Sequence, residues 1–179
     1  KMIASYLNDV DIKNVSLNFI KEDKPLGTAG SLSLLKGKIN TTFFISNCDI
    51  LIDQDLVEIF EYHKKNKNEI TMVSALKHIS IAYGTIETGE DGILETMVEK
   101  PELTFKINTG VYILEPELID EVPNDKFYHI TELIEQVKNR GGRVGVFPIS
   151  EKSWLDIGEW PEYIKTVRTL SDGENFKGL

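Results

Sequence analysis

Short runs of apolar residues recur along the chain, and each run is bounded by turn-forming residues. Two such turns are the polar segments Asn66-Lys67-Asn68 and Glu90-Asp91-Gly92. Apolar runs of this length between turns are typical of strands. The predicted strands cover residues 15–20, 42–46, 70–77, 83–88, 93–99, 106–114 and 143–149.

Apolar positions at helical spacing separate some of these runs. Leu56, Ile59 and Phe60 fall on one face of a helix, and His63 shares that face. Pro161 would lie in the first turn of the last helix, where proline is tolerated. The predicted helices cover residues 55–66, 130–139 and 159–170, with a shorter helical pattern over residues 31–35.

The order of these elements indicates the fold class. Strands alternate with helices in the first half, which argues for an α/β sheet that is largely parallel and covered by helices. Helices interrupt the strands less between residues 70 and 114, so an antiparallel piece is expected there. The sequence of 179 residues shows no linker or internal repeat, which predicts one domain over residues 1–179.

Composition and charge narrow the classes of partner. The apolar content of 41% and charged content of 27% are those of a soluble globular protein. A net charge of −9 argues against non-specific binding to nucleic acid or anionic membrane. No apolar run approaches the roughly 20 residues of a membrane span. The single cysteine, Cys48, allows no internal disulfide and suits the reducing cytoplasm.

An acidic residue and a glycine-bearing loop lead from the first predicted strand into the 31–35 pattern. They are Glu22 and the string Leu26-Gly27-Thr28-Ala29-Gly30. Backbone at a glycine approaches a flat ligand closely, because no Cβ intervenes. Two glycines at a strand-to-helix turn therefore suggest a nucleotide contact, with an ordinary tight turn as the alternative for the glycines alone.

The strand predicted over residues 42–46 ends in Asn47-Cys48-Asp49. Open α/β sheets bind ligands at the carboxyl ends of their strands. Asp49 is therefore well placed to hold Mg²⁺, which takes one or two carboxylates plus substrate phosphates. A turn without a ligand is the alternative. We expect Cys48 to be a small packed residue, as buried cysteine usually is.

Three later segments carry further polar groups. In Glu99-Lys100-Pro101 the proline restricts Lys100 to extended conformations, and a lysine serves phosphate as a point charge. A solvated strand end is the alternative. Asn108-Thr109-Gly110 offers amide, hydroxyl and bare backbone, a set that can hydrogen-bond a sugar rim. Trp154-Leu155-Asp156-Ile157-Gly158 by itself indicates a turn with a partly buried tryptophan.

Taken in order, these segments resemble the sugar-1-phosphate nucleotidyltransferases, or nucleotide-sugar pyrophosphorylases, and are similar to mannose-1-phosphate guanylyltransferase-like enzymes. The motifs are P-L-G-T-A-G after an acidic residue, Asn-x-Asp, V-E-K-P, Asn-Thr-Gly and W-x-D-x-G. The resemblance extends from Ile3 to near Leu170. It implies a Rossmann-like mixed, mostly parallel sheet flanked by helices, of the nucleotide-diphospho-sugar transferase type.

The resemblance also implies a role for each matched position. Asp49 and Asp156 would bind Mg²⁺, and Lys100 would contact the phosphates, so these three form the expected catalytic set. The expected base contacts are Glu22, Leu26, Gly27, Thr28, Ala29 and Gly30. The other expected substrate contacts are Asn47, Glu99, Asn108, Thr109 and Gly110.

The sequence departs from the family pattern in two places. Cys48 stands where glycine is common, although Asp49 stays in register. The glycine-rich G-G-x-G-T-R-L loop that grips the triphosphate in the family is absent. We therefore expect a catalytic domain that begins after its N-terminal triphosphate-binding segment and is inactive alone.

The resemblance implies transfer of a nucleoside monophosphate from a nucleoside triphosphate to a sugar 1-phosphate, in the cytoplasm. A non-catalytic sugar-nucleotide-binding relative and a metal-dependent glycosyltransferase are the alternatives. Retention of both aspartates and Lys100 favours an enzyme, and the lack of D-x-D at residues 47–49 disfavours a glycosyltransferase. Neither nucleic acid nor membrane is an expected partner, and homo-oligomerisation is left open.

Glu22 favours GTP as the nucleotide. A carboxylate can accept hydrogen bonds from both N1–H and the 2-amino group of guanine. Uracil and thymine place carbonyl oxygens beside their single N–H, and these oxygens would face the negative charge. The alternative is that Glu22 is solvated and that the backbone of residues 26–30 contacts the base.

Overall fold

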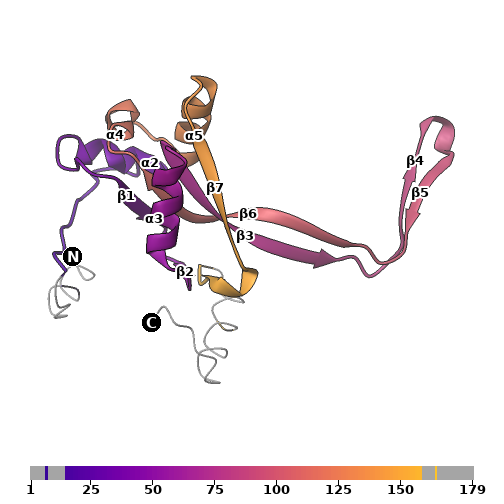
Figure 1. The fold of residues 1–179 in the computed structure, drawn as a ribbon. Helices are drawn as coiled ribbons and strands as arrows, with labels where there is room; N and C mark the ends of the chain where they lie inside the picture. The colour runs from indigo at the N-terminus through magenta and orange to yellow at the C-terminus, as the bar shows by residue number, and fades with distance from the viewer. Residues whose placement is uncertain (1–6, 8–14, 159–163, 165–179) are drawn as a thin grey trace. The chain divides into compact units, whose positions relative to one another are not determined.

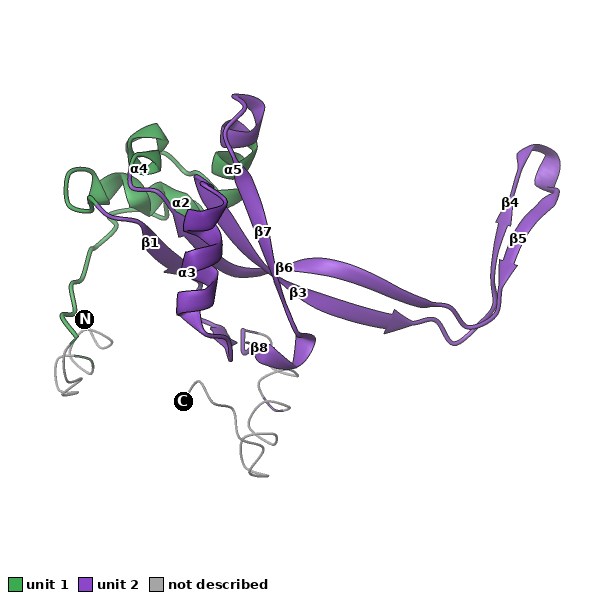
Figure 2. Ribbon diagram, in the orientation of Figure 1, with its two compact units in different colours: residues 1–40, 117–135 green, residues 41–116, 136–179 purple. Residues whose placement is uncertain are grey.

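The computed structural model describes Leu7, residues 15–158 and Ile164, and the chain divides into two compact units (Figure 2). Unit 1 consists of residues 1–40 and 117–135, and unit 2 consists of residues 41–116 and 136–179. Apart from Ile164, the helix predicted over residues 159–170 lies outside the described residues. No described helix is long and apolar enough to cross a membrane.

Unit 2 contains a four-stranded mixed sheet in the order β1-β6-β3-β7 (Figure 1). Its strands are β1 (Phe43–Ser46), β3 (Ile70–Ser80), β6 (Glu102–Leu114) and β7 (Val144–Ile149). β3 and β7 are parallel, whereas β6 runs antiparallel to both β1 and β3. The α/β class with a mixed sheet is confirmed, and so is the antiparallel piece expected between residues 70 and 114.

The expectation of a largely parallel sheet is wrong for these four strands, because only one of their three pairings is parallel. The reason lies in the connections. Parallel neighbours need a crossover of a dozen or more residues, usually through a helix, whereas a hairpin connection reverses the chain. No α-helix lies between β3 and β6 in the described chain, so these strands return antiparallel.

Two smaller antiparallel sheets complete the strands of unit 2 within the described residues. β4 (Thr85–Thr88) pairs with β5 (Leu94–Val98) across the short turn Glu90–Gly92. β2 (Ile50–Ile52) pairs with β8 (Trp154–Asp156). The sequence predicts β4 and β5 but not β2 or β8, because three residues are too few to show the alternation of a strand.

The helix α3 (Leu56–Lys65) forms where the sequence predicts it. The Asp55 side chain caps its start by accepting a hydrogen bond from Val57 N at 2.8 Å. Basic residues occupy its last turn, where the helix dipole favours positive charge. Ile59 of α3 is fully buried and belongs to the hydrophobic core of unit 2. The other members of this core are Val73, Ala75, Val111, Ile113 and Ile149.

The helix α5 (Ile130–Asn139) is confirmed with the predicted bounds. Gly141 follows it at a φ of 81°, the left-handed conformation in which many helices end. The predicted apolar stripe is buried, as Ile130, Leu133, Ile134 and Val137.

A polar cluster in unit 2 joins α3 to the ends of three strands. The buried His63 lies with Nδ1 2.8 Å from Thr71 Oγ1 and Nε2 3.1 Å from Glu115 Oε1. Lys64 and Thr42 also donate to the Glu115 carboxylate, at 2.6 and 2.8 Å. Burial lowers the pKa of His63 despite the opposing effect of Glu115. Burial alone would raise the pKa of Glu115, but its three hydrogen bonds hold that pKa below the usual range.

Unit 1 contains the short helix α2 (Gly27–Gly30), the 3-10 turn η1 (Ser31–Leu35) and the helix α4 (Leu118–Glu121). The helical pattern predicted over residues 31–35 is confirmed. The strand predicted over residues 15–20 is wrong, since this segment has no regular structure and its side chains are exposed. A strand needs a neighbour for its backbone N–H and C=O groups, and no described segment pairs with this one.

Candidate functional site

The pairing of β2 with β8 brings two aspartates together in unit 2. Asp49 directly precedes β2, and Asp156 ends β8 opposite Ile50. The backbone extends the contact, because Ile157 N donates to Asp49 O at 2.9 Å. Two acids that are distant in the sequence are thereby held side by side on neighbouring segments of the chain.

Both carboxylates turn toward Gly158. A Cβ placed on Gly158 would stand 2.6 Å from Asp49 Oδ2 and 3.2 Å from Asp156 Oδ1. The separation of these two oxygens therefore cannot exceed the sum of the two distances. Gly158 N also donates to Asp156 Oδ1 at 2.9 Å, which fixes the second carboxylate. The absence of a side chain at Gly158 leaves the space in which the two acids converge.

The donor set at this point fits a divalent cation of the Mg²⁺ type. Asp49 Oδ1 is buried and has no hydrogen-bond partner among the described residues. A buried carboxylate oxygen left unpaired is costly, and a cation would satisfy it. The described residues contain no cluster of three or more His, Cys, Asp or Glu that could cage a metal. Mg²⁺ does not require one, because it keeps several waters and binds through one or two carboxylates plus phosphates.

Cys48, next to Asp49, is exposed and free. The expectation that it packs as a small buried residue is therefore wrong. It lies in the turn between β1 and β2, where the chain leaves the four-stranded sheet.

Asn47 and Asn108 meet at Gly110, on the strand next to β1. Gly110 has a φ of 81°, and a Cβ there would stand 2.8 Å from Asn47 Nδ2. Asn47 N donates to Gly110 O at 3.1 Å, and Gly110 N donates to Asn108 Oδ1 at 3.1 Å. Glycine is needed at this position for both its backbone conformation and the close approach of Asn47.

Thr109 does not present its hydroxyl at a surface. Its side chain is buried, and Oγ1 donates to Val73 O at 2.8 Å and accepts from Val111 N at 3.3 Å. Trp154 Nε1 donates to the carbonyl oxygen of Thr109 at 3.3 Å. The sequence expectation of an open hydroxyl at residue 109 is wrong in this structure, because the hydroxyl satisfies backbone groups where the β3–β6 register shifts.

Glu99 and Lys100 are exposed in the connection between β5 and β6. Lys100 has a φ of 44°, so the extended conformation expected before Pro101 is wrong. The bend that leads from β5 into β6 overrides the local preference of a residue before proline. A Cβ on Gly84 would stand 2.9 Å from Glu99 Oε2, which places that carboxylate beside the Gly84 backbone. No hydrogen bond or ion pair within the described chain joins either residue to the two aspartates.

The glycine-bearing loop lies in unit 1, and its own chain fills the space beside its glycines. Gly27 has a φ of 79°, and a Cβ there would stand 2.7 Å from Tyr128 O. A Cβ on Gly30 would stand 2.6 Å from Lys126 O. Ala29 N and Gly30 N both donate to Tyr128 O at 3.0 Å. In this structure the glycines permit close packing of two backbone segments, so the bare backbone faces protein at these points.

Two side chains of this loop also bind backbone. Glu22 Oε2 accepts a hydrogen bond from Leu26 N at 3.2 Å, which holds the carboxylate at the start of the loop. Thr28 Oγ1 accepts from Ile130 N at 3.0 Å and so caps the start of α5.

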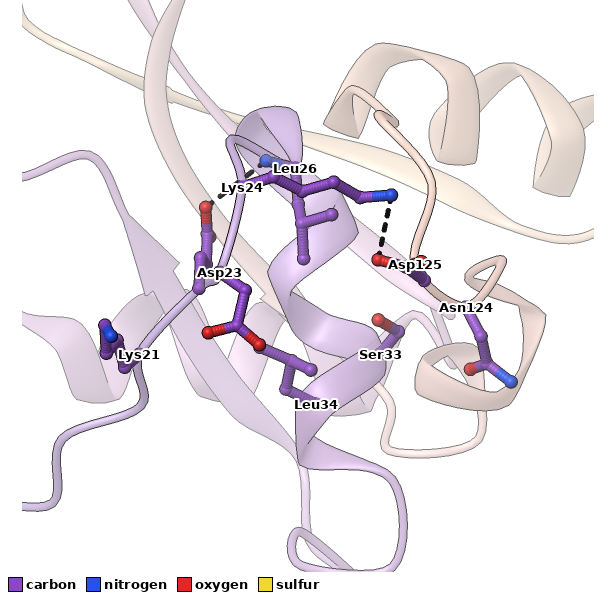
Figure 3. A pocket seen from close by; sticks show the side chains of 9 residues that line it. Lys21, Asp23, Lys24, Leu26, Ser33, Leu34, Asn124 and Asp125 are labelled. Atoms are coloured by element: carbon purple, nitrogen blue, oxygen red, sulfur yellow. Dashed lines mark hydrogen bonds and ion pairs between the residues drawn. The ribbon is translucent and has the colours of Figure 1, made fainter.

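A pocket of about 240 Å³ opens beside Glu22 and Leu26 in unit 1 (Figure 3). Lys24 and Asp125 form an ion pair of 3.0 Å at its rim, and both side chains are largely exposed. The pocket mixes both charge signs and contains the predicted base contacts Glu22 and Leu26, but not residues 27–30. Its remaining lining residues are Lys21, Asp23, Ser33, Leu34 and Asn124.

Sequence reasoning gave no role to Gly84, Tyr112 or Gly158. Gly158 is the last residue of the W-x-D-x-G motif, so the motif could have indicated that this glycine lies at the site. Tyr112 follows Asn108 by four residues, a spacing that carries no signal unless the bulge at Gly110 is known. Gly84 is an isolated glycine within the strand predicted over residues 83–88, which suggests a bulge or a close approach of backbone but does not name its neighbour.

The comparison with known families and sequences gives a consistent result. The nucleotidyl transferase family profile matches residues 1–173. Probable mannose-1-phosphate guanylyltransferase 3 of Arabidopsis thaliana is 28% identical over 98% of this chain and 57% of its own length. Mannose-1-phosphate guanyltransferase 2 of Candida glabrata is 31% identical over 84% of this chain and 43% of its own length. The chain thus spans about half the length of the curated relatives that it matches.

Solved structures show the same fold. HddC from Yersinia pseudotuberculosis complexed with GMP-PN is 25% identical with a TM-score of 0.67, over 94% of this chain and 73% of that chain. A putative glucose-1-phosphate thymidylyltransferase from Bacillus anthracis has a TM-score of 0.68 over 99% of this chain and 76% of that chain. At 20% identity, the second shows similarity of fold alone.

Proposed function

This chain belongs to the nucleotidyl transferase family, and from that premise we propose that the full-length protein is a sugar-1-phosphate nucleotidyltransferase. A phosphate oxygen of the sugar 1-phosphate attacks the α-phosphorus of a nucleoside triphosphate. The bond from that phosphorus to the bridging oxygen breaks, and pyrophosphate leaves. The observation that carries the proposal is the convergence of Asp49 and Asp156 on Gly158, with one buried carboxylate oxygen left unpartnered.

Asp49 and Asp156 are the residues that would hold Mg²⁺. When bound, the ion supplies neutralisation of phosphate charge, which is a large part of catalysis in phosphoryl transfer. The β2–β8 pairing and the bond from Ile157 N to Asp49 O fix the backbone at both aspartates, and the Gly158 N–H holds the Asp156 carboxylate without help from a ligand.

The remaining catalytic work is alignment of two anions. In our proposal Lys100 contacts phosphate as a point charge, and the sugar contacts are Glu99, Asn47, Asn108 and the backbone at Gly110. Thr109 would contribute through the bulge that it stabilises, since its hydroxyl is engaged with Val73 O. No side chain has to act as a nucleophile in this reaction.

We propose GTP as the preferred nucleotide, with the base bound at Glu22 and the loop from Leu26 to Gly30. The proposal draws support from the guanylyltransferase names of the relatives and from the GMP-PN complex of a structural neighbour. Glu22 keeps acceptor capacity after it binds Leu26 N, because an ionised carboxylate has about four lone-pair sites.

The reaction is tested with the full-length protein by measuring pyrophosphate-dependent cleavage of GDP-mannose and the forward reaction with Mg²⁺. We expect Asp49→Asn and Asp156→Asn to lower turnover by about a hundredfold or more, since each removes a charge at the proposed metal site. Asp53→Asn, at the other end of β2 from Asp49, is the matched control and should stay within a few-fold of the unaltered protein.

The same assay separates the alternative functions. A non-catalytic relative would bind the sugar nucleotide without cleaving it. A glycosyltransferase would release a nucleoside diphosphate in place of a triphosphate. Equal activity of Asp49→Asn and Asp53→Asn would contradict the two-aspartate site.

The nucleotide preference has its own test, which compares GTP with UTP before and after Glu22→Gln. An unpaired polar group costs about 1–3 kcal/mol, so we expect a roughly ten- to hundredfold preference for GTP that Glu22→Gln reduces. Equal use of both nucleotides by the unaltered protein would refute the guanine assignment while leaving the reaction class standing.

A further inference from the structure

Tyr112 lies next to Asn108 although four positions separate them on β6. In a regular strand four residues span about 13 Å. The register of β6 against β3 shows why they meet, because Met72 pairs with Tyr112 and Ser74 pairs with Asn108. An advance of two residues along β3 thus matches an advance of four residues along β6. The extra residues form the bulge at Gly110, and Tyr112 and Asn108 become neighbours on the same face of the sheet.

The contact between them is a short hydrogen bond. Asn108 Nδ2 donates to the Tyr112 hydroxyl oxygen at 2.6 Å. Only 3% of Tyr112 is exposed, whereas Asn108 is exposed. Burial raises the pKa of Tyr112, against the opposing effect of the bond from Asn108, so the phenol stays protonated at neutral pH. A buried, neutral hydroxyl thus supports an amide at the surface.

The amide is held at both of its ends. Its oxygen accepts from Gly110 N at 3.1 Å, while its nitrogen donates to Tyr112. The reversed orientation would set the NH₂ group against the Gly110 N–H, with donor facing donor. One N–H and one lone pair of Asn108 are left over, and their directions are fixed.

We propose that Tyr112 is a positioning residue that sets sugar selectivity by fixing the orientation of the Asn108 amide. The inference rests on the proposed function, in which Asn108 contacts the sugar. Each pyranose hydroxyl can donate and accept, but epimers differ in where that hydroxyl stands. An amide with a fixed donor and a fixed acceptor therefore matches one hydroxyl arrangement better than its epimer. The ratio of activities between epimers is large when the wrong epimer leaves polar groups of the site without a hydrogen-bond partner.

Tyr112→Phe removes one of the two restraints and keeps the ring that fills the core. We expect the KM for the sugar 1-phosphate to rise roughly tenfold, in keeping with the loss of one hydrogen bond, with the KM for the nucleotide unchanged. The ratio of kcat/KM between mannose 1-phosphate and glucose 1-phosphate should shrink. Tyr62→Phe is the matched control, because it also removes a tyrosine hydroxyl that makes one hydrogen bond in unit 2, here as the donor to Val146 O at 3.1 Å.

A double-mutant cycle tests whether Tyr112 acts through Asn108. In an Asn108→Ala background, Tyr112→Phe should have no further effect on the KM for the sugar 1-phosphate. Additive effects of the two changes would overturn the proposal. So would a Tyr112→Phe variant with the same sugar KM and the same selectivity as Tyr62→Phe.

A second measurement separates this inference from the proposed function. The side-chain amide protons of Asn108 can be followed by NMR in the full-length protein without substrate. Tyr112→Phe should shift and broaden this resonance pair, whereas Tyr62→Phe should leave it in place. An unaltered resonance in Tyr112→Phe refutes the positioning role whatever the activity. A protein that is inactive with every nucleotide and hexose 1-phosphate refutes the proposed function and the selectivity role with it.

Discussion

Replacing Gly158 by alanine tests the two-aspartate arrangement without removing either acid. The added Cβ would stand 2.6 Å from Asp49 Oδ2, whereas ordinary contacts begin at 3.4 Å, so the carboxylate must withdraw by about 0.8 Å. Asp156 Oδ1, at 3.2 Å, must also shift slightly. A misplacement of about 1 Å in a reacting group can cost about a hundredfold in rate. We expect Gly158→Ala to lower kcat by about that factor and to raise the Mg²⁺ concentration needed for half-maximal activity.

Stability should change little, because the displaced atom is the end of a short side chain at a partly open surface. We expect a loss of less than about 1 kcal/mol in the free energy of unfolding, measured by urea titration. Gly89→Ala is the matched control, since its Cβ would also crowd a flexible carboxylate, that of Glu95, but on the β4–β5 hairpin. This control should retain activity.

The reasoning fails if Gly158→Ala keeps activity within threefold of the unaltered protein and shows the same Mg²⁺ requirement. That result would mean that the placement of Asp49 and Asp156 seen in this structure does not matter for turnover. A large loss of stability in Gly158→Ala alone would instead show that Gly158 serves folding.

Gly27→Ala should lower the free energy of unfolding, measured in urea, by at least about 1 kcal/mol more than Gly37→Ala does. Both glycines have a positive φ, but only at Gly27 would the added Cβ press against the Tyr128 backbone. Equal losses in the two variants would mean that the whole cost comes from the backbone conformation. Burial lowers the pKa of His63 below the 6.5 of a free imidazole, so protonation favours the unfolded chain. The contribution of His63 is complete above pH 6.5 and declines as the pH falls through the lowered pKa. His63→Gln should therefore flatten the loss of stability between pH 6.5 and 5, and identical pH profiles would contradict a buried neutral imidazole beside Glu115.

The longer elements were predictable because their side chains repeat at a structural period. The apolar stripe of α5 and the capped start of α3 are local signals, and both helices form as predicted. The segment 15–20 carries an equally apolar pattern, yet it has no strand partner among the described residues. Sequence pattern reports what a segment could bury, whereas a strand also depends on a neighbour that the pattern does not name.

The sequence motifs named the two aspartates that the structure brings together, but they did not give the geometry around them. The motif positions of Asp49 and Asp156 pointed to one location, but the β2–β8 pairing that joins them is too short to read from the sequence. Lys100 shows the opposite failure, because a rule for residues before proline gave an extended backbone where the bend between β5 and β6 has a φ of 44° at this residue. Thr109 was misjudged because the bulge that uses its hydroxyl arises from the register of two strands.

The ladder between β2 and β8 also has a consequence for folding. It closes a loop of roughly a hundred residues, and long-range contacts of this kind form late because the chain must first give up the entropy of that loop. The unfolded chain therefore holds the two aspartates apart and has no comparable cation site. A cation that needs both acids binds the native state alone, and each tenfold rise in its concentration above Kd adds about 1.4 kcal/mol to native stability. Of the strand pairings among the described residues of unit 2, this one is the most distant in sequence, so a cation bound at the proposed site would report that the chain has finished folding.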